Sequence, residues 1–203
     1  LTLNRAELFF TDKAIFIEGD TERILLPAMM KKIDNEFQEN KLLSQNISIV
    51  EVGNYANIFE KFINFIGMKT LIITDLDSVK YDFIKNKDGS NKIFSKGKTR
   101  KAFLTCKVSH GEKSSSPTLN YFFKDSIFNV LKDKTFIEKR FNKEDSIWKV
   151  NENGCLQITY QTYFNNYHAR SFEDAFFAIP DNINFIKSNR SKFRGLKNIK
   201  FFY

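Results

Sequence analysis

Three carboxylates stand at the ends of two short apolar segments that read as strands. Glu18 closes the segment that starts at Lys13, and Asp75 and Asp77 directly follow the segment 70–74. In an open α/β sheet, ligands bind outside the carboxyl ends of the strands, so we expect these side chains to converge. Clustered carboxylates repel one another unless a cation offsets them, and oxygen-only ligands favour a hard ion, Mg²⁺ or Mn²⁺.

The segments that must position these residues alternate between strand and helix patterns. Strands are expected at 13–18, 47–52 and 70–74, where β-branched and aromatic residues form short runs bounded by Gly or polar residues. The first intervening helix can be capped by Asp20 or Thr21, and Gly67 is expected to end the second. Apolar residues recur on one face of each helix: Leu25, Met29 and Ile33 in the first, and Ile58, Phe62 and Phe65 in the second. This alternation predicts an α/β fold, a parallel sheet flanked by helices.

The remainder of the chain is less regular. Residues 79–125 are dominated by Lys and Asn and contain turn signals, which indicates a lysine-rich insertion or loop region. A helix is expected at about 121–131, a strand at 156–160 and a capped helix start at Ser171. We expect residues 1–203 to form a single domain, since the chain is too short for two domains of typical size.

Composition excludes several classes of protein. Hydrophobic residues make up 42% of the chain, as in globular proteins, and no segment approaches the roughly 20 apolar residues of a membrane span. The first residues lack an initiator Met and the features of a signal peptide, so we expect a fragment of a longer chain. Cys106 and Cys155 lie far apart and form no zinc motif, which favours reduced thiols and a cytoplasmic location.

The charge balance points to a polyanionic partner. Lys and Arg number 32 against 24 Asp and Glu, a net charge of +8 with a pI near 9.3. The densest basic run lies close to Phe94 and Phe103, and comprises Lys96, Lys98, Arg100 and Lys101. Such a run is either a solvated loop or a contact with the backbone of a nucleic acid.

A strand that ends in Glu-Gly, then a helix, then a strand that ends in Asp-x-Asp resembles the TOPRIM domain of topoisomerases, primases and some nucleases. The sequence is more closely similar to the overcoming-lysogenization-defect (OLD) family of ATP-dependent endonucleases, at residues 18–22, 25–27, 51–53, 69–77 and 170–175. The family implies an ABC-type ATPase domain in the same longer chain, assembly as a homo-oligomer and a role in anti-phage defence. No phosphate-binding G-x-x-x-x-G-K-[ST] motif occurs in these residues. A downstream catalytic lysine of the family is expected beyond Tyr203.

The resemblance also implies roles for individual residues in Mg²⁺-dependent hydrolysis of a phosphodiester, with DNA expected ahead of RNA. Glu18 would bind a metal or act as general base, and Asp75 and Asp77 would be metal ligands. Glu173 and Asp174 would complete the metal shell. Glu22 is either a further ligand or an acidic residue that favours the start of its helix. Arg170 is either a phosphate contact or an ordinary surface arginine.

Two alternatives remain open. The segment 71–78 also resembles the D-x-D loop of haloacid-dehalogenase-like phosphatases, in which Asp75 would be the nucleophile. Against this, that loop normally follows the first strand of its fold, whereas here it follows the third. The other alternative is a non-catalytic TOPRIM scaffold that binds nucleic acid or a partner subunit.

Overall fold

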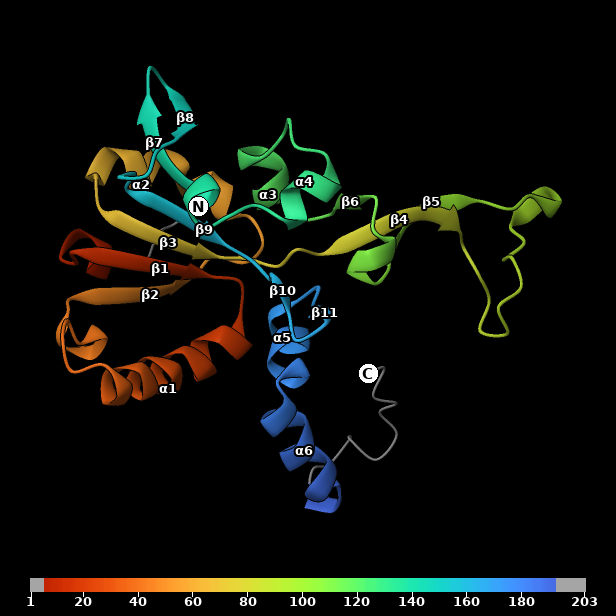
Figure 1. The fold of residues 1–203 in the computed structure, drawn as a ribbon. Helices are drawn as coiled ribbons and strands as arrows, with labels where there is room; N and C mark the ends of the chain where they lie inside the picture. The colour runs from red at the N-terminus through yellow and green to blue at the C-terminus, as the bar shows by residue number, and fades with distance from the viewer. Residues whose placement is uncertain (1–5, 193–203) are drawn as a thin grey trace.

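The computed structural model describes residues 6–192, in which a six-stranded sheet forms the centre (Figure 1). The strand order is β2-β1-β3-β9-β7-β8, and β2, β1, β3 and β9 are parallel whereas β7 and β8 are antiparallel. Their bounds are β1 Lys13–Ile17, β2 Ile47–Glu51, β3 Lys69–Ile73, β7 Arg140–Glu144, β8 Ile147–Val150 and β9 Leu156–Thr159. This mostly parallel sheet with flanking helices confirms the predicted fold class, including the strand expected at 156–160.

Helices connect and cover the parallel strands. The α-helices are α1 Asp20–Glu36, α2 Glu60–Ile66, α3 Pro117–Phe122, α4 Phe128–Lys132, α5 Phe172–Ala178 and α6 Pro180–Ser188. Short 3-10 turns occupy Ala6–Phe9, Leu42–Ser44, Ala56–Phe59, Ser95–Gly97, Val108–His110, Ile137–Lys139 and Arg190–Lys192. Gly67 ends α2 in a left-handed conformation with φ 70°, as expected. The single helix expected at about 121–131 is wrong, because a turn in which Ser126 N–H donates to the Phe123 carbonyl separates α3 from α4.

The predicted caps and faces of the first two helices require correction. Neither Asp20 nor Thr21 caps α1; Gly19 is the N-cap, and its N–H donates to the Glu22 carboxylate at 3.1 Å. The buried face of α1 lies one position later than predicted and consists of Glu22, Leu26, Met30 and Asp34. In α2 the buried residues are Glu60 and Ile63, whereas Phe65 is 82% exposed.

The stretch 79–125, expected to be an insertion or loop, contains regular structure. Strands β4 Ser78–Phe83, β5 Lys101–Thr105 and β6 Lys113–Ser114 form an antiparallel three-stranded sheet in the order β5-β4-β6. This sheet leaves the end of β3 and projects away from the central sheet (Figure 1). We call residues 78–114 the arm. A second small hairpin, β10 Tyr163–Phe164 and β11 Tyr167–His168, precedes α5.

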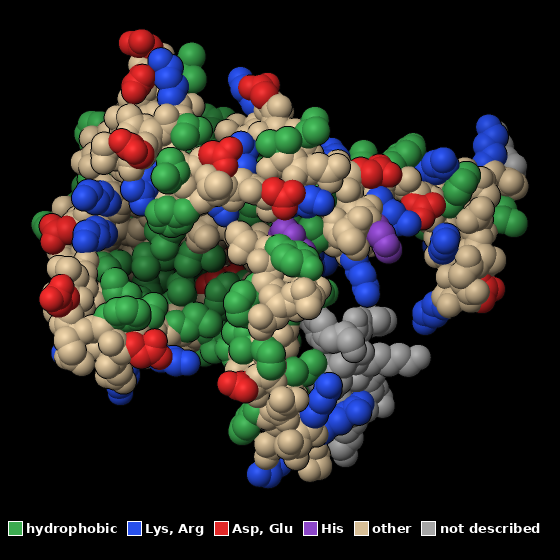
Figure 2. Space-filling view, viewed as in Figure 1, with side chains coloured by type: hydrophobic (Ala, Val, Ile, Leu, Met, Phe, Trp, Pro, Cys, Tyr) green, Lys and Arg blue, Asp and Glu red, His purple; other side chains and the backbone are tan. Residues whose placement is uncertain are grey.

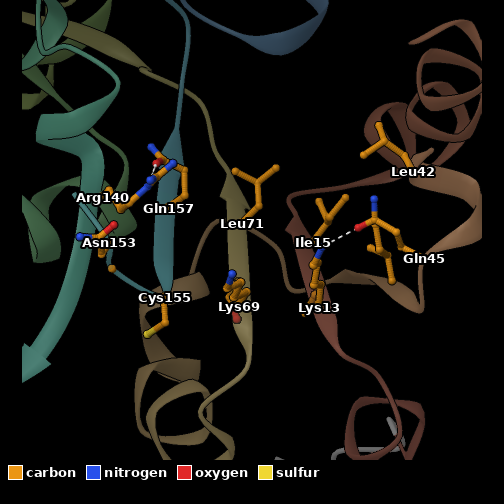
Figure 3. Close-up of a pocket in the computed structure, with 14 residues that line it drawn as sticks. Lys13, Ile15, Leu42, Gln45, Lys69, Leu71, Arg140, Asn153, Cys155 and Gln157 are labelled. Carbon is orange, nitrogen blue, oxygen red and sulfur yellow. Dashed lines mark hydrogen bonds between the residues drawn. The ribbon is translucent and has the colours of Figure 1, made fainter. Parts of the chain in front are cut away.

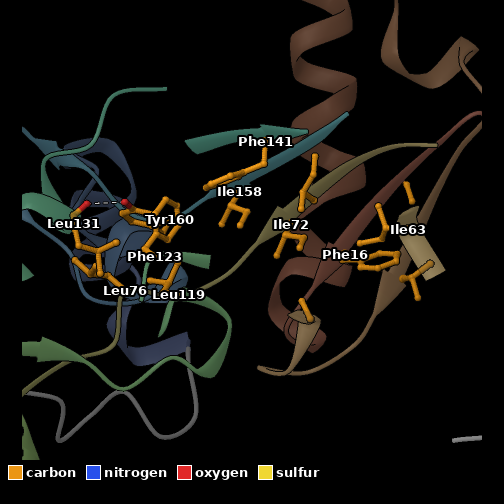
Figure 4. Close-up of a cluster of buried hydrophobic side chains, with 14 of the residues drawn as sticks. Phe16, Ile63, Ile72, Leu76, Leu119, Phe123, Leu131, Phe141, Ile158 and Tyr160 are labelled. Atoms are coloured by element: carbon orange, nitrogen blue, oxygen red, sulfur yellow. Dashed lines mark hydrogen bonds between the residues drawn. The ribbon is translucent and has the colours of Figure 1, made fainter. Parts of the chain in front are cut away.

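Buried apolar side chains fill the space between the central sheet and the helices α2, α3 and α4 (Figure 4). Phe16, Ile72 and Ile158 come from neighbouring parallel strands. Half-buried residues of the other face flank Ile72 and Ile158, whereas the neighbour of Phe16 on that face, Ile17, is fully buried. Tyr160 closes the cluster, and its hydroxyl donates to the Leu131 carbonyl at 2.6 Å. Burial of this one face fixes the register of the strands, because a one-residue shift would turn the apolar set toward solvent. No helix among residues 6–192 combines the length and the apolar character of a membrane span.

Candidate functional site

Glu18 joins the carboxyl ends of two neighbouring parallel strands. It follows β1 directly, and its Oε1 accepts hydrogen bonds from the Asp75 N–H at 3.0 Å and from the Thr74 hydroxyl. The Thr74 hydroxyl also lies 3.2 Å from the hydroxyl of Ser116, the N-cap of α3. Both contacts use Oε1, so the other carboxylate oxygen of Glu18 remains for a ligand.

Two other segments of the chain donate hydrogen bonds to the Asp75 carboxylate. Its Oδ1 accepts hydrogen bonds from the Gln161 side-chain amide and from the Phe172 N–H, each at 2.8 Å. Burial raises the pKa of Asp75 to about 7, and the negative charges of Glu18 and Asp77 add to this shift against the two hydrogen bonds. Without a metal ion, Asp75 therefore keeps its proton up to about pH 7, well above the ordinary range of an Asp.

Asp77 directly precedes the arm and is paired with Arg170. Its backbone has φ 47°, a left-handed conformation that Asp adopts more readily than most residues. The Asp77 N–H donates to the Arg170 carbonyl, and the Asp77 carbonyl accepts from the Ser115 N–H, both at 3.0 Å. The Arg170 guanidinium donates to Asp77 Oδ1 at 2.6 Å, while Arg170 Nε is buried with no partner among the described residues.

Glu22 and Glu173 extend the acidic group toward α1 and α5. Glu22 is 4% exposed and lies in the first turn of α1, which packs against α5. Burial raises the pKa of Glu22, and the charges of Glu173 and Glu18 raise it further. Electrostatic interactions thus link Glu173, Glu22, Glu18, Asp75 and Asp77 in that order.

Asp174 has several hydrogen bonds within the protein. Its carboxylate accepts from the Tyr167 hydroxyl at 2.9 and 3.0 Å and from the Arg170 N–H at 2.9 Å. Ser171 caps α5, as expected, by accepting from the Asp174 N–H at 3.2 Å. These contacts fix the loop that carries Arg170. A metal-ligating role for Asp174 stays a prediction.

The donor set fits a divalent ion in chemistry, but not yet in arrangement. Acidic oxygens gather at one sheet edge, where burial and, to a smaller extent, the charges of Glu18 and Asp77 raise the pKa of Asp75, and a cation would favour its charged form. Among residues 6–192, however, no three His, Cys, Asp or Glu side chains stand close enough together to hold a metal ion as they are. The assignment of metal ligands therefore stays a prediction, and binding would require the carboxylates to turn toward a common point.

The predicted basic residues separate into two places. Arg170 lies in the acidic site, whereas Lys98, Arg100 and Lys101 are exposed on the arm, and the side chain of Lys96 lies outside the described residues. The Arg100 guanidinium lies 4.8 Å from the ring centroid of Phe94. Gln161 and Ser116 are site residues that the sequence reasoning missed. Gln161 follows β9 and could have been found, since it too stands at the carboxyl end of a parallel strand.

A groove along the central sheet lies elsewhere. It has a volume of about 420 Å³ and is lined by Lys13, Lys69, Cys155 and their neighbours at the amino ends of β1, β3 and β9 (Figure 3). Lys13 donates to the Gln45 side chain across it. Ligands of such sheets bind at the carboxyl ends of the strands. The edge that carries Glu18, Asp75 and Asp77, which we call the acidic edge, is therefore the better candidate site.

Part of the chain is similar to a known family of domains. Residues 9–77 match the model of the overcoming lysogenization defect protein-like TOPRIM domain. Residues 9–77 are an OLD-like TOPRIM segment. The matched segment contains Glu18, Asp75 and Asp77, so the resemblance inferred from the motifs is confirmed.

Two curated relatives align with the chain. The chain is 30% identical over 172 residues to a protein named endonuclease GajA from Bacillus cereus (strain HuB5-5), covering 84% of the chain. It is 36% identical over 76 residues to the Old nuclease of Escherichia phage P2, covering 36% of the chain. These alignments span only 20% and 12% of the two relatives. No solved structure matches the chain.

Proposed function

We propose that this OLD-like TOPRIM domain is the nuclease domain of a metal-dependent endonuclease that hydrolyses phosphodiester bonds, with DNA as its substrate. The observation that carries the proposal is the partly buried pair Glu18 and Asp75 at the ends of two parallel strands, where the pKa of Asp75 is raised to about 7. The names of the two relatives, an endonuclease and a nuclease, support the same reaction.

The acidic edge would hold Mg²⁺ or Mn²⁺ through oxygen ligands. The candidate ligands are Glu18, Glu22, Asp75, Asp77, Glu173 and Asp174. When bound, the ion would polarise the phosphate and lower the pKa of a water molecule. Glu18 would bind the metal or accept a proton from the attacking water, since one of its oxygens remains outside the hydrogen bonds to β3. Gln161 and the Phe172 N–H would orient Asp75.

Basic residues would position the nucleic acid. Arg170 is close enough to the acidic edge to contact the phosphate beside the cleaved bond, because it already touches Asp77. The candidate backbone contacts on the arm are Lys96, Lys98, Arg100 and Lys101. We further propose that the domain acts in the cytoplasm, in anti-phage defence, within a longer chain that contains an ATPase domain and assembles as a homo-oligomer.

Glu18→Gln and Asp75→Asn in the complete protein test the proposal. Each variant should abolish Mg²⁺-dependent cleavage of DNA while the thermal unfolding midpoint stays at or above that of the parent, because no apolar contact is lost. Glu39→Gln removes an exposed carboxylate away from the site and serves as control. Cleavage at the parental rate by Asp75→Asn would rule out the assignment. A protein that hydrolyses phosphomonoesters but not DNA would instead support the phosphatase alternative.

One observation favours a second candidate function. Among the described residues, no cluster of three or more His, Cys, Asp or Glu side chains is already arranged around a metal site. In addition, Arg170 neutralises the charge of Asp77. This is the state expected of a TOPRIM scaffold that binds nucleic acid without cutting it. Nucleic-acid binding by the complete protein, with no cleavage at any Mg²⁺ or Mn²⁺ concentration, would select that function.

A further inference from the structure

Nearly all of the net charge of the chain resides in the arm. Residues 78–114 contain ten Lys or Arg and three Asp or Glu, a net charge of +7, whereas the whole chain carries +8. Figure 2 shows these basic side chains spread over the projecting part of the molecule. Because the arm starts at the residue that follows Asp77, this charge begins directly beside the acidic edge.

The strand register divides the arm sheet into two unlike faces. In the β4–β5 pair, Tyr81 lies opposite Phe103 and Phe83 lies opposite Lys101, so these four side chains share one face. Lys113 of β6 is paired with Val79 and belongs to the same face. On the opposite face, Lys80 forms an ion pair with Asp82 at 2.9 Å, and Ala102 and Leu104 complete that side.

The first face carries cations and rings in alternation. The ammonium of Lys113 lies 4.5 Å from the ring centroid of Phe103, and that of Lys101 lies 4.6 Å from Phe83 and 5.9 Å from Tyr81. The rings of Tyr81 and Phe103 are 5.3 Å apart and remain 53% and 49% exposed. No strand position on this face is acidic. The rings therefore contact two exposed lysines without neutralising them. The carboxylate of Glu112, at the edge of the sheet, accepts a hydrogen bond from the Tyr81 N–H at 3.1 Å.

Resting on the proposed function, we infer that this face of the arm binds the phosphodiester backbone of the nucleic acid to one side of the cleaved bond, through Lys101 and Lys113. The spacing suits that ligand. Four residue steps along β4 separate Val79 from Phe83, which is about 13 Å at about 3.3 Å per residue. Measured along the axis of duplex DNA, where the phosphates of one strand repeat about every 3.4 Å, this length corresponds to about four phosphates. The ion pair on the opposite face makes that side unsuitable for an anion.

Binding of labelled single-stranded and duplex DNA of one sequence, measured in EDTA over a range of salt concentrations, tests the inference in the complete protein. Lys101→Ala/Lys113→Ala should lower the affinity and reduce the steepness of the salt dependence by about 1.8 for duplex or about 1.4 for single strands. Lys31→Ala/Lys32→Ala removes two exposed charges from α1 and is the matched control. A loss of affinity for only one form of DNA identifies that form as the ligand. A loss of affinity for both forms identifies the backbone that they share.

An unchanged salt dependence in the arm variant, or an equal change in the control, would overturn the inference. The assay separates this inference from the nuclease proposal, since EDTA prevents cleavage. If the parent binds DNA through these lysines but never cuts it when Mg²⁺ is supplied, only the proposal of nuclease activity is refuted. If the parent cuts DNA but the arm variant binds DNA with the parental salt dependence, only the inference about the arm is refuted.

Discussion

The N–H of Asp75 donates a hydrogen bond of 3.0 Å to the carboxylate of Glu18. This contact joins β3 to β1 at the edge where both strands end, so the position of one carboxylate depends on the other. It also brings two negative charges together in a partly buried place, which is one reason why the pKa of Asp75 is raised. A substitution at either residue is therefore expected to change the position or the pKa of the other carboxylate.

The raised pKa of Asp75 predicts a pH-dependent stability in the absence of metal. Between its ordinary value of 3.8 and about 7, the folded protein binds more protons at this group than the unfolded chain does. Stability from this group is thus present at low pH and is lost as the pH rises through about 7. Thermal unfolding in EDTA between pH 5 and pH 8, at about one-unit steps, measures this loss.

Asp75→Asn should remove that pH dependence and raise the unfolding midpoint at pH 8 by several degrees, since about 1 kcal/mol corresponds to about 2–4 °C in a chain of this size. Asn retains an oxygen that accepts from Gln161 and Phe172. The matched control is Asp82→Asn, where an ion pair with Lys80 lowers the pKa of Asp82, so the variant should not gain stability. A parental pH profile in Asp75→Asn would contradict the electrostatic account.

Gln161 supports both Asp75 and the backbone beside it. Its amide donates to Asp75 Oδ1, and its carbonyl accepts from the Leu76 N–H at 2.7 Å. Gln161→Leu leaves a buried N–H without a partner, which should cost about 1–3 kcal/mol, and should weaken Mg²⁺ binding by about 10–100-fold. Calorimetric Mg²⁺ titration and chemical unfolding measure the two effects.

Gln157→Leu is the control for this variant, because Gln157 lies on the same strand β9 but bonds to Phe136, Lys139 and Arg140 instead. It should reduce stability while Mg²⁺ affinity stays at the parental value. Equal Mg²⁺ affinities in the two variants would show that Gln161 does not orient a metal ligand.

Removing Arg170 should affect metal and nucleic acid in opposite directions. Its guanidinium lies 2.6 Å from Asp77, so Arg170→Met leaves that carboxylate uncompensated. Mg²⁺ should then bind more tightly, whereas DNA affinity in EDTA should fall and its salt dependence should flatten by about 0.9. The same direction of change in both affinities would mean that Arg170 acts only through the stability of its loop.

Glu173 and Asp174 are adjacent, yet we expect different responses from them. Glu173 interacts with Glu22 through charge, so Glu173→Gln should weaken Mg²⁺ binding at unchanged or slightly higher stability. Asp174 accepts from the Tyr167 hydroxyl and the Arg170 N–H, so Asp174→Asn should lower the unfolding midpoint. Thermal unfolding with and without Mg²⁺ separates the two, and identical behaviour would refute this division.

The parallel sheet could be predicted because its strands are short apolar runs bounded by Gly and polar residues. Glu18 and Asp75 could be brought together by topology alone, since parallel neighbours end at one edge. The inward face of α1 could not be found from hydrophobicity, because charged residues occupy both of its ends. Glu22 turns toward the site, and Asp34 accepts from the N–H groups of Leu42 and Leu43.

The arm escaped prediction for a different reason. Its strands bury little apolar surface, so the usual alternation of apolar and polar residues is replaced by rings beside lysines. Such a pattern resembles a loop in composition. The pairing of Asp77 with Arg170 was likewise beyond the sequence, because 93 positions separate the two residues and neither belongs to a strand of the central sheet.

The backbone of Asp77 is clamped on both sides, to Arg170 and to Ser115. These two hydrogen bonds tie the base of the arm to the loop that carries Arg170 and to the residue that follows the arm. A nucleic acid lying along the arm would meet the carboxylates at a constant number of nucleotides from its last contact with Lys101. The protein would then behave as a ruler, cutting at a fixed offset from the stretch that the arm covers, whatever the sequence at the cut.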